Sequence, residues 1–205
     1  MEDDARDIRA YLKGSMSAFH RLYTRYERPL FFYILSMVRD YGTAEDLLQE
    51  TWLQVVTKLP SFGFRGAFRN WIYTIAHHKV IDFTRANDNH AVAHLEDDLP
   101  DGSERTLHDI VADPAPGIVR QAGARELCAH VQTLVADLPE AQREVFLLRT
   151  DGGLSFKEIA AIQKAPLNTV LGRMHYAVKR LRAELTQLME HEHLEEQPAR
   201  CAVEG

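Results

Sequence analysis

Residues 154–185 carry the pattern of two short helices joined by a tight turn. Ser155 and Glu158 form a capping box, in which the hydroxyl and the carboxylate satisfy the first free backbone amides of a helix. That helix breaks around Lys164, and Pro166 stands where the first turn of a second helix tolerates proline. Apolar residues then recur at helical spacing: Val170, Met174, Ala177, Val178, Leu181 and Leu185. The pattern therefore predicts a helix-turn-helix.

The outer face of the second helix is polar and basic, with Asn168, Thr169, Arg173, His175, Tyr176, Lys179, Arg180 and Arg182. A helix of this kind can lie in the major groove of DNA. The competing interpretation is an ordinary helical hairpin with a solvated basic face. The residues favour DNA binding over this alternative, but they do not tell for what purpose DNA would be bound.

Composition limits the class of protein. A chain of 205 residues, 45% of them hydrophobic, can bury one good core or two small ones. Cys128 and Cys201 are too few for a disulfide framework, which indicates a reducing compartment. The N-terminus is acidic without an apolar run, and no apolar stretch reaches membrane-spanning length. We therefore expect a cytoplasmic protein without membrane insertion.

The net charge of −6 is divided unevenly along the chain. Residues 1–86 and 125–185 each carry +2, whereas residues 87–124 carry −6 and residues 186–205 carry −4. The acidity therefore belongs to a linker and a tail, and the two folded parts are mildly basic. Neither part has the strongly basic stripe of a protein that grips DNA alone. This favours a module that something larger delivers to DNA.

The N-terminal part predicts helices over 5–13, 17–25, 30–38 and 44–59, the last of them capped by Thr43. In the helix over 44–59, Leu47, Leu48, Trp52, Val55 and Val56 can pack inward. Its outer face is acidic and rich in amides, with Glu45, Asp46, Gln49 and Glu50. This face is either an ordinary solvated surface, favoured by the helix dipole, or a docking face for a basic partner.

A glycine-rich loop over 60–66 precedes a predicted helix over 67–84 in which aromatic and basic residues alternate. Exposed aromatics beside arginines suit the capture of an unstacked base. Trp71 taken alone is more often a core residue than a platform for a base. The combination of loop and helix nevertheless favours contact with single-stranded nucleic acid.

Residues 43–52 (TAEDLLQETW) and 68–76 (FRNWIYTIA) resemble region 2 of bacterial RNA polymerase sigma factors of the extracytoplasmic-function (ECF) group. Residues 138–149 (LPEAQREVFLLR) and the helix-turn-helix resemble region 4 of the same group. The resemblance implies an all-α fold of two small helical domains, over 5–86 and 125–186. A flexible acidic linker over 87–124 would join them, and an acidic tail over 187–205 would follow.

The resemblance also implies what each surface binds. The residues expected to contact core RNA polymerase, at its clamp coiled coil and flap, are Asp46, Leu47, Gln49, Glu50 and Trp52. The separated strand of the −10 promoter element would be met by Phe62, Phe64, Arg65, Arg69, Trp71, Tyr73, Thr74, His78, Lys79 and Arg85. Duplex DNA of the −35 element would be met by Ser155, Asn168, Thr169, Leu171, Gly172, Arg173, His175, Tyr176 and Lys179. An anti-sigma factor that masks both domains is a further expected partner.

The chain departs from the family pattern at several positions. Leu171 and Gly172 stand where the family usually has Lys or Arg followed by Ser, and Lys164 stands at the usual glycine of the turn. His78 replaces a common Asn. These changes imply an altered promoter preference, either through contact of Leu171 with a thymine methyl or through phosphate contacts and DNA shape.

Two other functions compete with a promoter-specificity subunit. The first is a stand-alone helix-turn-helix regulator whose N-terminal part senses a ligand or dimerises; weak net basicity argues against unaided duplex binding. The second is a nucleic-acid enzyme, for which the sequence offers no phosphate loop, metal cluster or nucleophile–base pair. We therefore expect no catalytic residue, no metal, no cofactor and no small-molecule substrate. His191, His193 and Cys201 in the tail lack the spacing of a zinc-binding helix.

Overall fold

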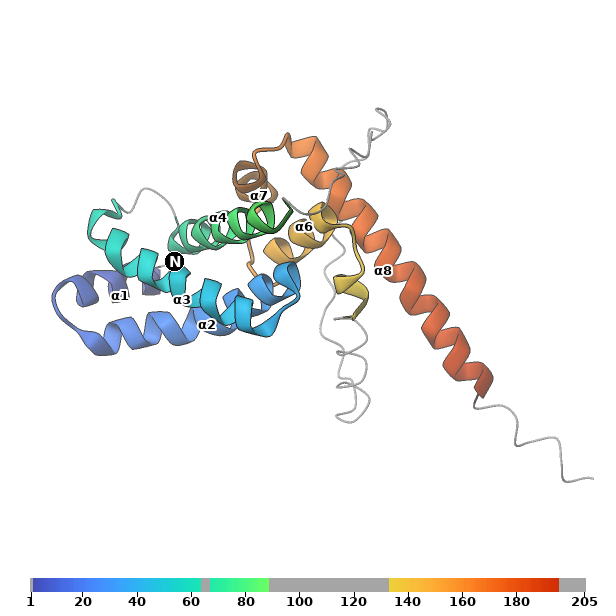
Figure 1. The fold of residues 1–205 in the computed structure, drawn as a ribbon, viewed down its shortest axis with the longest axis horizontal. Helices are drawn as coiled ribbons and strands as arrows, with labels where there is room; N and C mark the ends of the chain where they lie inside the picture. Colours follow the sequence, from blue (N-terminus) through green and yellow to red (C-terminus); the bar gives the residue numbers. More distant parts are fainter. Residues whose placement is uncertain (1, 64–66, 89–132, 196–205) are drawn as a thin grey trace, which may run out of the picture.

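The computed structural model describes residues 2–63, 67–88 and 133–195, and within these ranges the regular structure is entirely helical (Figure 1). The elements are α1 (Glu2–Leu12), α2 (Met16–Val38), α3 (Tyr41–Lys58), the short 3-10 helix η1 (Leu59–Ser61), α4 (Phe68–Asp88), α6 (Glu140–Thr150), α7 (Phe156–Gln163) and α8 (Leu167–Glu195). The all-helical prediction is confirmed. None of these helices combines the length and apolar character that a membrane span requires.

Helix α2 is continuous through Pro29, so the prediction of separate helices over 17–25 and 30–38 is wrong. Proline inside a helix removes a hydrogen bond and costs about 3 kcal/mol. The buried face continues across Pro29 without a break, since Tyr26 and Leu30 are both buried. Packing of this face against α1, α3 and α4 outweighs the local cost.

The start of α3 also differs from the prediction. Asp40, not Thr43, is the N-cap residue, and its carboxylate accepts a hydrogen bond from the Thr43 backbone amide at 2.8 Å. Hydrogen bonds from Thr43 hold the pKa of Asp40 below its usual value. A capping carboxylate stabilises the free amides of a helix start in the same way as the predicted hydroxyl.

The C-terminal part has the predicted helix-turn-helix, formed by α7 and α8. The capping box is present: Ser155 Oγ accepts from the Glu158 amide at 3.3 Å, and Glu158 Oε2 accepts from the Ser155 amide at 2.8 Å. Helix α8 continues to Glu195, past the expected domain end at residue 186, and projects away from the other helices (Figure 1).

The two predicted domains lie in contact. Helix α2 packs against α6, and α4 packs against α7 (Figure 1). One continuous hydrophobic core runs from Ile8 in α1 to Leu181 in α8. The surfaces predicted for the −10 and −35 elements are therefore held on a single compact arrangement of helices.

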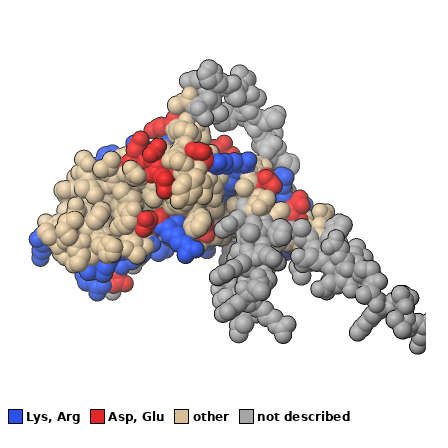
Figure 2. Space-filling model, turned by 60° about the horizontal axis from the view of Figure 1, so that its bottom comes forward, with Lys and Arg blue, Asp and Glu red and all other residues tan. Residues whose placement is uncertain are grey.

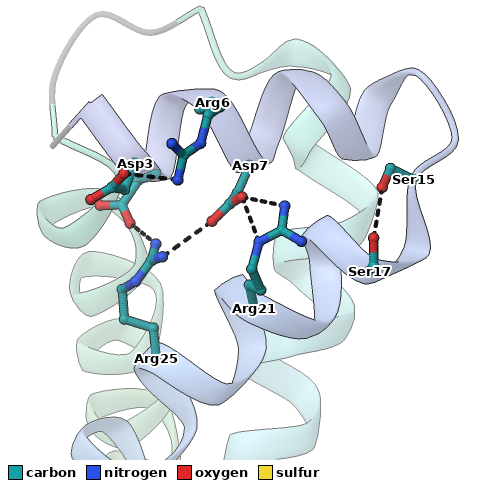
Figure 3. Close-up of polar contacts among 8 residues, drawn as sticks. Asp3, Arg6, Asp7, Ser15, Ser17, Arg21 and Arg25 are labelled. Carbon is teal, nitrogen blue, oxygen red and sulfur yellow. Dashed lines mark hydrogen bonds and ion pairs between the residues drawn. The ribbon is translucent and has the colours of Figure 1, made fainter.

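Two buried aspartates, Asp4 and Asp7, fasten α1 to α2, and Figure 3 shows Asp7 between Arg21 and Arg25. Asp7, fully buried, accepts from Arg21 Nε at 3.0 Å and Nη2 at 2.7 Å, and from Arg25 Nη2 at 3.1 Å. Asp4 accepts from Tyr26 Oη at 2.7 Å and also pairs with Arg25. Burial alone would raise the pKa of Asp7, but the hydrogen bonds and charges of Arg21 and Arg25 outweigh burial and hold that pKa below its usual value. The first helix is thus tied to the bundle by charged hydrogen bonds as well as by Ile8.

We predict that Asp7→Asn lowers the free energy of unfolding by about 1–3 kcal/mol, because the two guanidinium groups lose their shared anion. Urea denaturation followed by circular dichroism measures the loss. Asp3→Asn is the matched control, since the Asp3–Arg6 pair is exposed and is worth less than about 1 kcal/mol.

The difference between wild type and Asp7→Asn should depend on pH. A carboxyl group with a lowered folded-state pKa stabilises the protein at pH values above its unfolded-state pKa, and this effect is lost as the pH falls through the lower folded-state pKa. An equal loss for both aspartate variants, or a loss that does not fade in acid, would contradict this role of Asp7.

Candidate nucleic-acid interface

The outer face of α3 is acidic as predicted and also apolar in part. Glu45, Asp46, Gln49 and Glu50 are exposed. Leu53 follows on the same helix with 68% of its surface exposed, and Val56, expected to pack inward, is 36% exposed. A face with an acidic first half and an apolar second half fits a partner surface better than it fits plain solvation. Leu53 was not among the predicted contact residues. Its position in the sequence could have revealed it, because it does not belong to the apolar residues of this helix that can pack inward.

Two residues predicted to contact the polymerase lie beneath this face. Leu47 and Trp52 are each 6% exposed. The Trp52 ring packs against Phe19 and Tyr23, with centroids 5.8 and 4.9 Å away. Leu47 and Trp52 can hold the predicted docking face in place, but they present little surface to a partner.

An ion pair joins the predicted docking face to the predicted DNA face. Lys79 Nζ in α4 lies 2.6 Å from Glu50 Oε2 in α3. Both side chains keep access to water, at 29% and 51% exposure. Lys79 is therefore held beside α3 and must exchange Glu50 for a phosphate if it is to bind DNA.

Aromatic rings gather where the loop meets α4. The centroids of Phe62 and Trp71 lie 4.7 Å apart at 37°, and Phe68 lies 5.9 Å from Phe62 and 5.7 Å from Trp71. Phe68 is buried, whereas Phe62 and Trp71 are half-buried and keep part of their rings accessible. The predicted residues Phe64 and Arg65 lie outside the described residues. The part that is described already forms an aromatic platform.

The remaining residues predicted for the −10 strand fall into two groups. Arg69, His78 and Arg85 are exposed on α4. Tyr73 is 1% exposed, and Thr74 Oγ1 donates to the Asn70 carbonyl at 2.7 Å, so both are engaged within the bundle. Burial and the neighbouring His77 lower the pKa of His78, which favours the neutral imidazole over the charged form.

Only some of the α8 residues predicted to contact the −35 duplex are exposed to solvent. Asn168, Tyr176 and Lys179 are exposed, whereas Thr169, Gly172 and His175 are half-buried. Arg173 turns back to the helix-turn-helix, where its Nη1 donates to Gln163 Oε1 at 2.9 Å. Leu171 is half-buried and packs against the core. Ser155 uses its hydroxyl in the capping box.

Charge is distributed in small patches. Figure 2 shows acidic and basic side chains interspersed on one face, without a continuous basic stripe there. This agrees with the weak basicity that the sequence gives to both parts. Among the described residues, no group of three or more His, Cys, Asp or Glu side chains could hold a metal ion. Cys201 and the side chains of His191 and His193 lie outside what is described.

A helical bundle with clustered aromatic rings, placed on one chain with a helix-turn-helix, is the architecture of a two-part DNA-binding transcription factor. Family models agree with this class: Sigma-70 region 2 matches residues 22–90, and Sigma-70 region 4 matches residues 129–181.

Known proteins identify the family more closely. The ECF RNA polymerase sigma factor SigC of Mycobacterium tuberculosis is 32% identical over 151 residues, which cover 73% of this chain and 74% of SigC. The RNA polymerase sigma-H factor of Pseudomonas aeruginosa is 28% identical over 193 residues, 92% of this chain and 96% of that protein. The sigma factor RpoE of Bartonella quintana, solved with the anti-sigma factor NepR, superposes with a TM-score of 0.59 at 21% identity, over 82% of this chain and 96% of RpoE.

The chain belongs to the RNA polymerase sigma factors of the ECF group. It is a promoter-recognising subunit of RNA polymerase, and the stand-alone regulator is not favoured.

The turn of the helix-turn-helix generates a stability prediction. Lys164 has a left-handed backbone with φ of 51°, and its amide donates to the Ala160 carbonyl to end α7. A side chain in this conformation costs about 1–2 kcal/mol, which glycine avoids. We expect Lys164→Gly to raise the free energy of unfolding by about 0.5–1 kcal/mol, because the greater freedom of glycine in the unfolded chain offsets part of the gain.

Thermal or urea denaturation measures this gain, with Lys164→Ala as the control. Alanine removes the same charge near His78 but keeps Cβ, so it should bring no such gain. An equal gain in both variants would assign the effect to charge and not to the backbone.

Proposed function

We propose that this chain directs core RNA polymerase to its promoters through three surfaces and performs no catalysis of its own. The first is the outer face of α3, the second is the aromatic platform with the exposed cations of α4, and the third is the outer face of α8. The observation that carries the proposal is the half-buried, tilted Phe62–Trp71 pair beside a loop, because aromatic side chains that are not fully buried suit the stacking of unpaired bases.

The docking surface for core polymerase is assigned to Asp46, Gln49 and Glu50, together with exposed Leu53 and Val56. This face is complementary to a basic groove or coiled coil with an apolar edge. In this family, the clamp coiled coil of the polymerase offers such a surface. Leu47 and Trp52 support the face from below. Contact with the flap would fall to the helix-turn-helix part.

Contact with the −10 strand is assigned to Phe62, Trp71 and the exposed Arg69, His78 and Arg85, with Lys79 joining after release from Glu50. A neutral His78 would hydrogen-bond a base or sugar and add no charge for a phosphate. Phe64 and Arg65 complete the loop by the family resemblance. Melting is then aided by the free energy that flipped bases regain in protein pockets.

Contact with the −35 duplex is assigned to Asn168, Tyr176 and Lys179, with Thr169, Gly172 and His175 lining the approach. Arg173 would stabilise the helix-turn-helix and not contact DNA, since its guanidinium donates a hydrogen bond to Gln163. Leu171 offers only part of its side chain to a thymine methyl. Fewer polar groups than usual would read bases, which gives DNA shape a larger share of the specificity.

The proposed division of labour follows residues 5–86 and 125–186, with the acidic segment over 87–124 between them. RNA polymerase and promoters share the cytoplasm, so this is where the chain would act. The NepR complex of Bartonella quintana RpoE supports a protein inhibitor of the anti-sigma kind for this chain as well.

Run-off transcription with purified core polymerase on a library of genomic fragments tests the function. We expect discrete start sites that depend on this protein, each with a −10 and a −35 element in common. No stimulation of core polymerase, together with sequence-specific binding by the protein alone, would overturn the assignment in favour of a stand-alone regulator.

Trp71 provides a residue-level prediction. Base stacking on an aromatic ring is worth about 1–3 kcal/mol, so Trp71→Ala should slow open-complex formation by roughly 5- to 150-fold. Trp71→Phe keeps a π face and should lose much less. Both variants should bind core polymerase like the wild type, since Trp71 lies on α4 and not on the docking face of α3.

Binding to promoter DNA with a premelted −10 bubble distinguishes a loss of base contact from a loss of strand opening, because such DNA needs no melting. Weaker capture of the bubble strand by Trp71→Ala would support stacking. Equal losses in the Ala and Phe variants, or an unchanged rate in both, would contradict a platform role.

A further inference from the structure

A glutamine at the end of α7 joins a buried carboxylate to α8, the helix assigned to the −35 duplex. Glu144 of α6 is 5% exposed. Its Oε1 accepts from Tyr33 Oη at 2.7 Å and lies 2.5 Å from His77 Nδ1. Its Oε2 accepts from Gln163 Nε2 at 2.7 Å, and Gln163 Oε1 accepts from Arg173 Nη1 at 2.9 Å. Gln163 thus bridges Glu144 and Arg173 with two hydrogen bonds.

The two partners of Gln163 fix the orientation of its amide. A carboxylate only accepts hydrogen bonds and a guanidinium only donates them, so the NH2 group faces Glu144 and the carbonyl oxygen faces Arg173. Burial alone would raise the pKa of Glu144, but its hydrogen bonds with His77, Tyr33 and Gln163 and the charge of His77 outweigh burial and lower that pKa. Gln163 is therefore held by an ionised group and presents a hydrogen-bond acceptor to Arg173.

Arg173 starts from the edge of the DNA-facing side of α8. Tyr176 and Arg180 follow it three and seven positions later, on the same side of the helix, and both are exposed. Gly172 precedes it by one position, which is a rotation of about 100° around a helix. An arginine at this edge can reach the DNA backbone beside the groove. The side chain of Arg173 is instead half-buried, because its guanidinium is turned toward Gln163.

A cation that is kept from DNA matters in a chain with few cations to spare. Residues 125–185 carry a net charge of only +2. Each phosphate that a cation neutralises releases counterions and tightens binding to DNA of any sequence. The bond between Arg173 and Gln163 therefore competes with a contact that would strengthen binding to DNA without reading its bases.

We propose that Gln163 withholds Arg173 from the phosphate backbone of the −35 duplex and thereby weakens the binding of α8 to DNA of any sequence. The inference rests on the proposed −35 function of α8. Gln163 is a positioning residue, because it acts on DNA only through Arg173. Its consequence is that base contacts, DNA shape and delivery by polymerase take a larger share in the choice of promoter.

Gln163→Met tests the proposal in full-length protein bound to core RNA polymerase. Methionine is unbranched and similar in size, so it fills the space between Arg173 and Glu144 but offers the guanidinium no oxygen. Binding to a promoter duplex is measured between about 50 and 200 mM salt. We expect the affinity at low salt to rise roughly 3- to 10-fold, and the slope of log K against log salt to steepen by about 0.9, the value for one phosphate.

The same measurement on a duplex with a scrambled −35 element tests the kind of contact. A phosphate contact carries no sequence information, so Gln163→Met should gain equally on both duplexes. A gain confined to the intact −35 element would overturn the proposal, because it would assign Arg173 to a base.

Arg173→Met completes a double-mutant cycle with Gln163→Met. In the otherwise wild-type protein it should leave the salt slope unchanged, since Arg173 makes no phosphate contact there. In the Gln163→Met background it should remove the whole gain. Partial unfolding lowers the affinity by the same factor at every salt concentration, so the salt slope separates a DNA contact from a merely structural effect. A shallower slope for Arg173→Met alone would overturn the proposal.

Lys179→Met is the matched control, because Lys179 is an exposed cation of α8 that is assigned to the −35 duplex. It should make the salt slope shallower by about 0.9 with either residue at position 163. An unchanged slope in Lys179→Met would overturn the −35 assignment of α8, and the proposal with it. An effect of Lys179→Met without any gain in Gln163→Met would overturn the proposal alone.

Discussion

Burial of α2 is the constraint on which the other helices depend. This helix packs against α1, α3, α4 and α6, and Leu22, Leu30 and Tyr33 on it are each 0% exposed. Each such side chain contributes roughly 1.5–3 kcal/mol when it leaves water, which is enough to carry the helix through an internal proline. Because α3 and α4 are both positioned on α2, the docking face and the aromatic platform hold a fixed relation to one another.

Polar groups then determine the orientation of the C-terminal part, α6–α8, on the N-terminal bundle, α1–α4. The hydrophobic core alone is non-directional and would accept several orientations of α6 on α2. Glu144 removes this freedom, because a charged oxygen within a core is tolerated only where donors meet it at hydrogen-bond distance. The arrangement is therefore specific.

Local signals in the sequence were sufficient for much of this protein. The capping box at Ser155, the unusual lysine at position 164 and the acidic face of α3 all rest on residues within four positions of one another, and each is present in the structure. The continuity of α2 through Pro29 could not be predicted, because it depends on three other helices. Arg173 shows the same limit: its place in the helical pattern is polar and outward, but Gln163 draws it inward. Tyr33 and His77, which bond to Glu144, lie 111 and 67 residues away from it in the chain, beyond the reach of any periodic pattern.

If Glu50 and Lys79 bind as proposed, their ion pair would make the two binding events thermodynamically reciprocal. A basic partner that takes Glu50 leaves Lys79 without its anion, and the lysine then meets a phosphate at less cost. By linkage, a phosphate that takes Lys79 raises the affinity of Glu50 for the partner by the same factor. An exposed pair is worth about 0.3–1 kcal/mol, so the factor is roughly two to five. Such a modest cooperativity would bias the protein toward DNA that already lies beside polymerase, and it would leave both proposed contacts weak enough to be released after initiation.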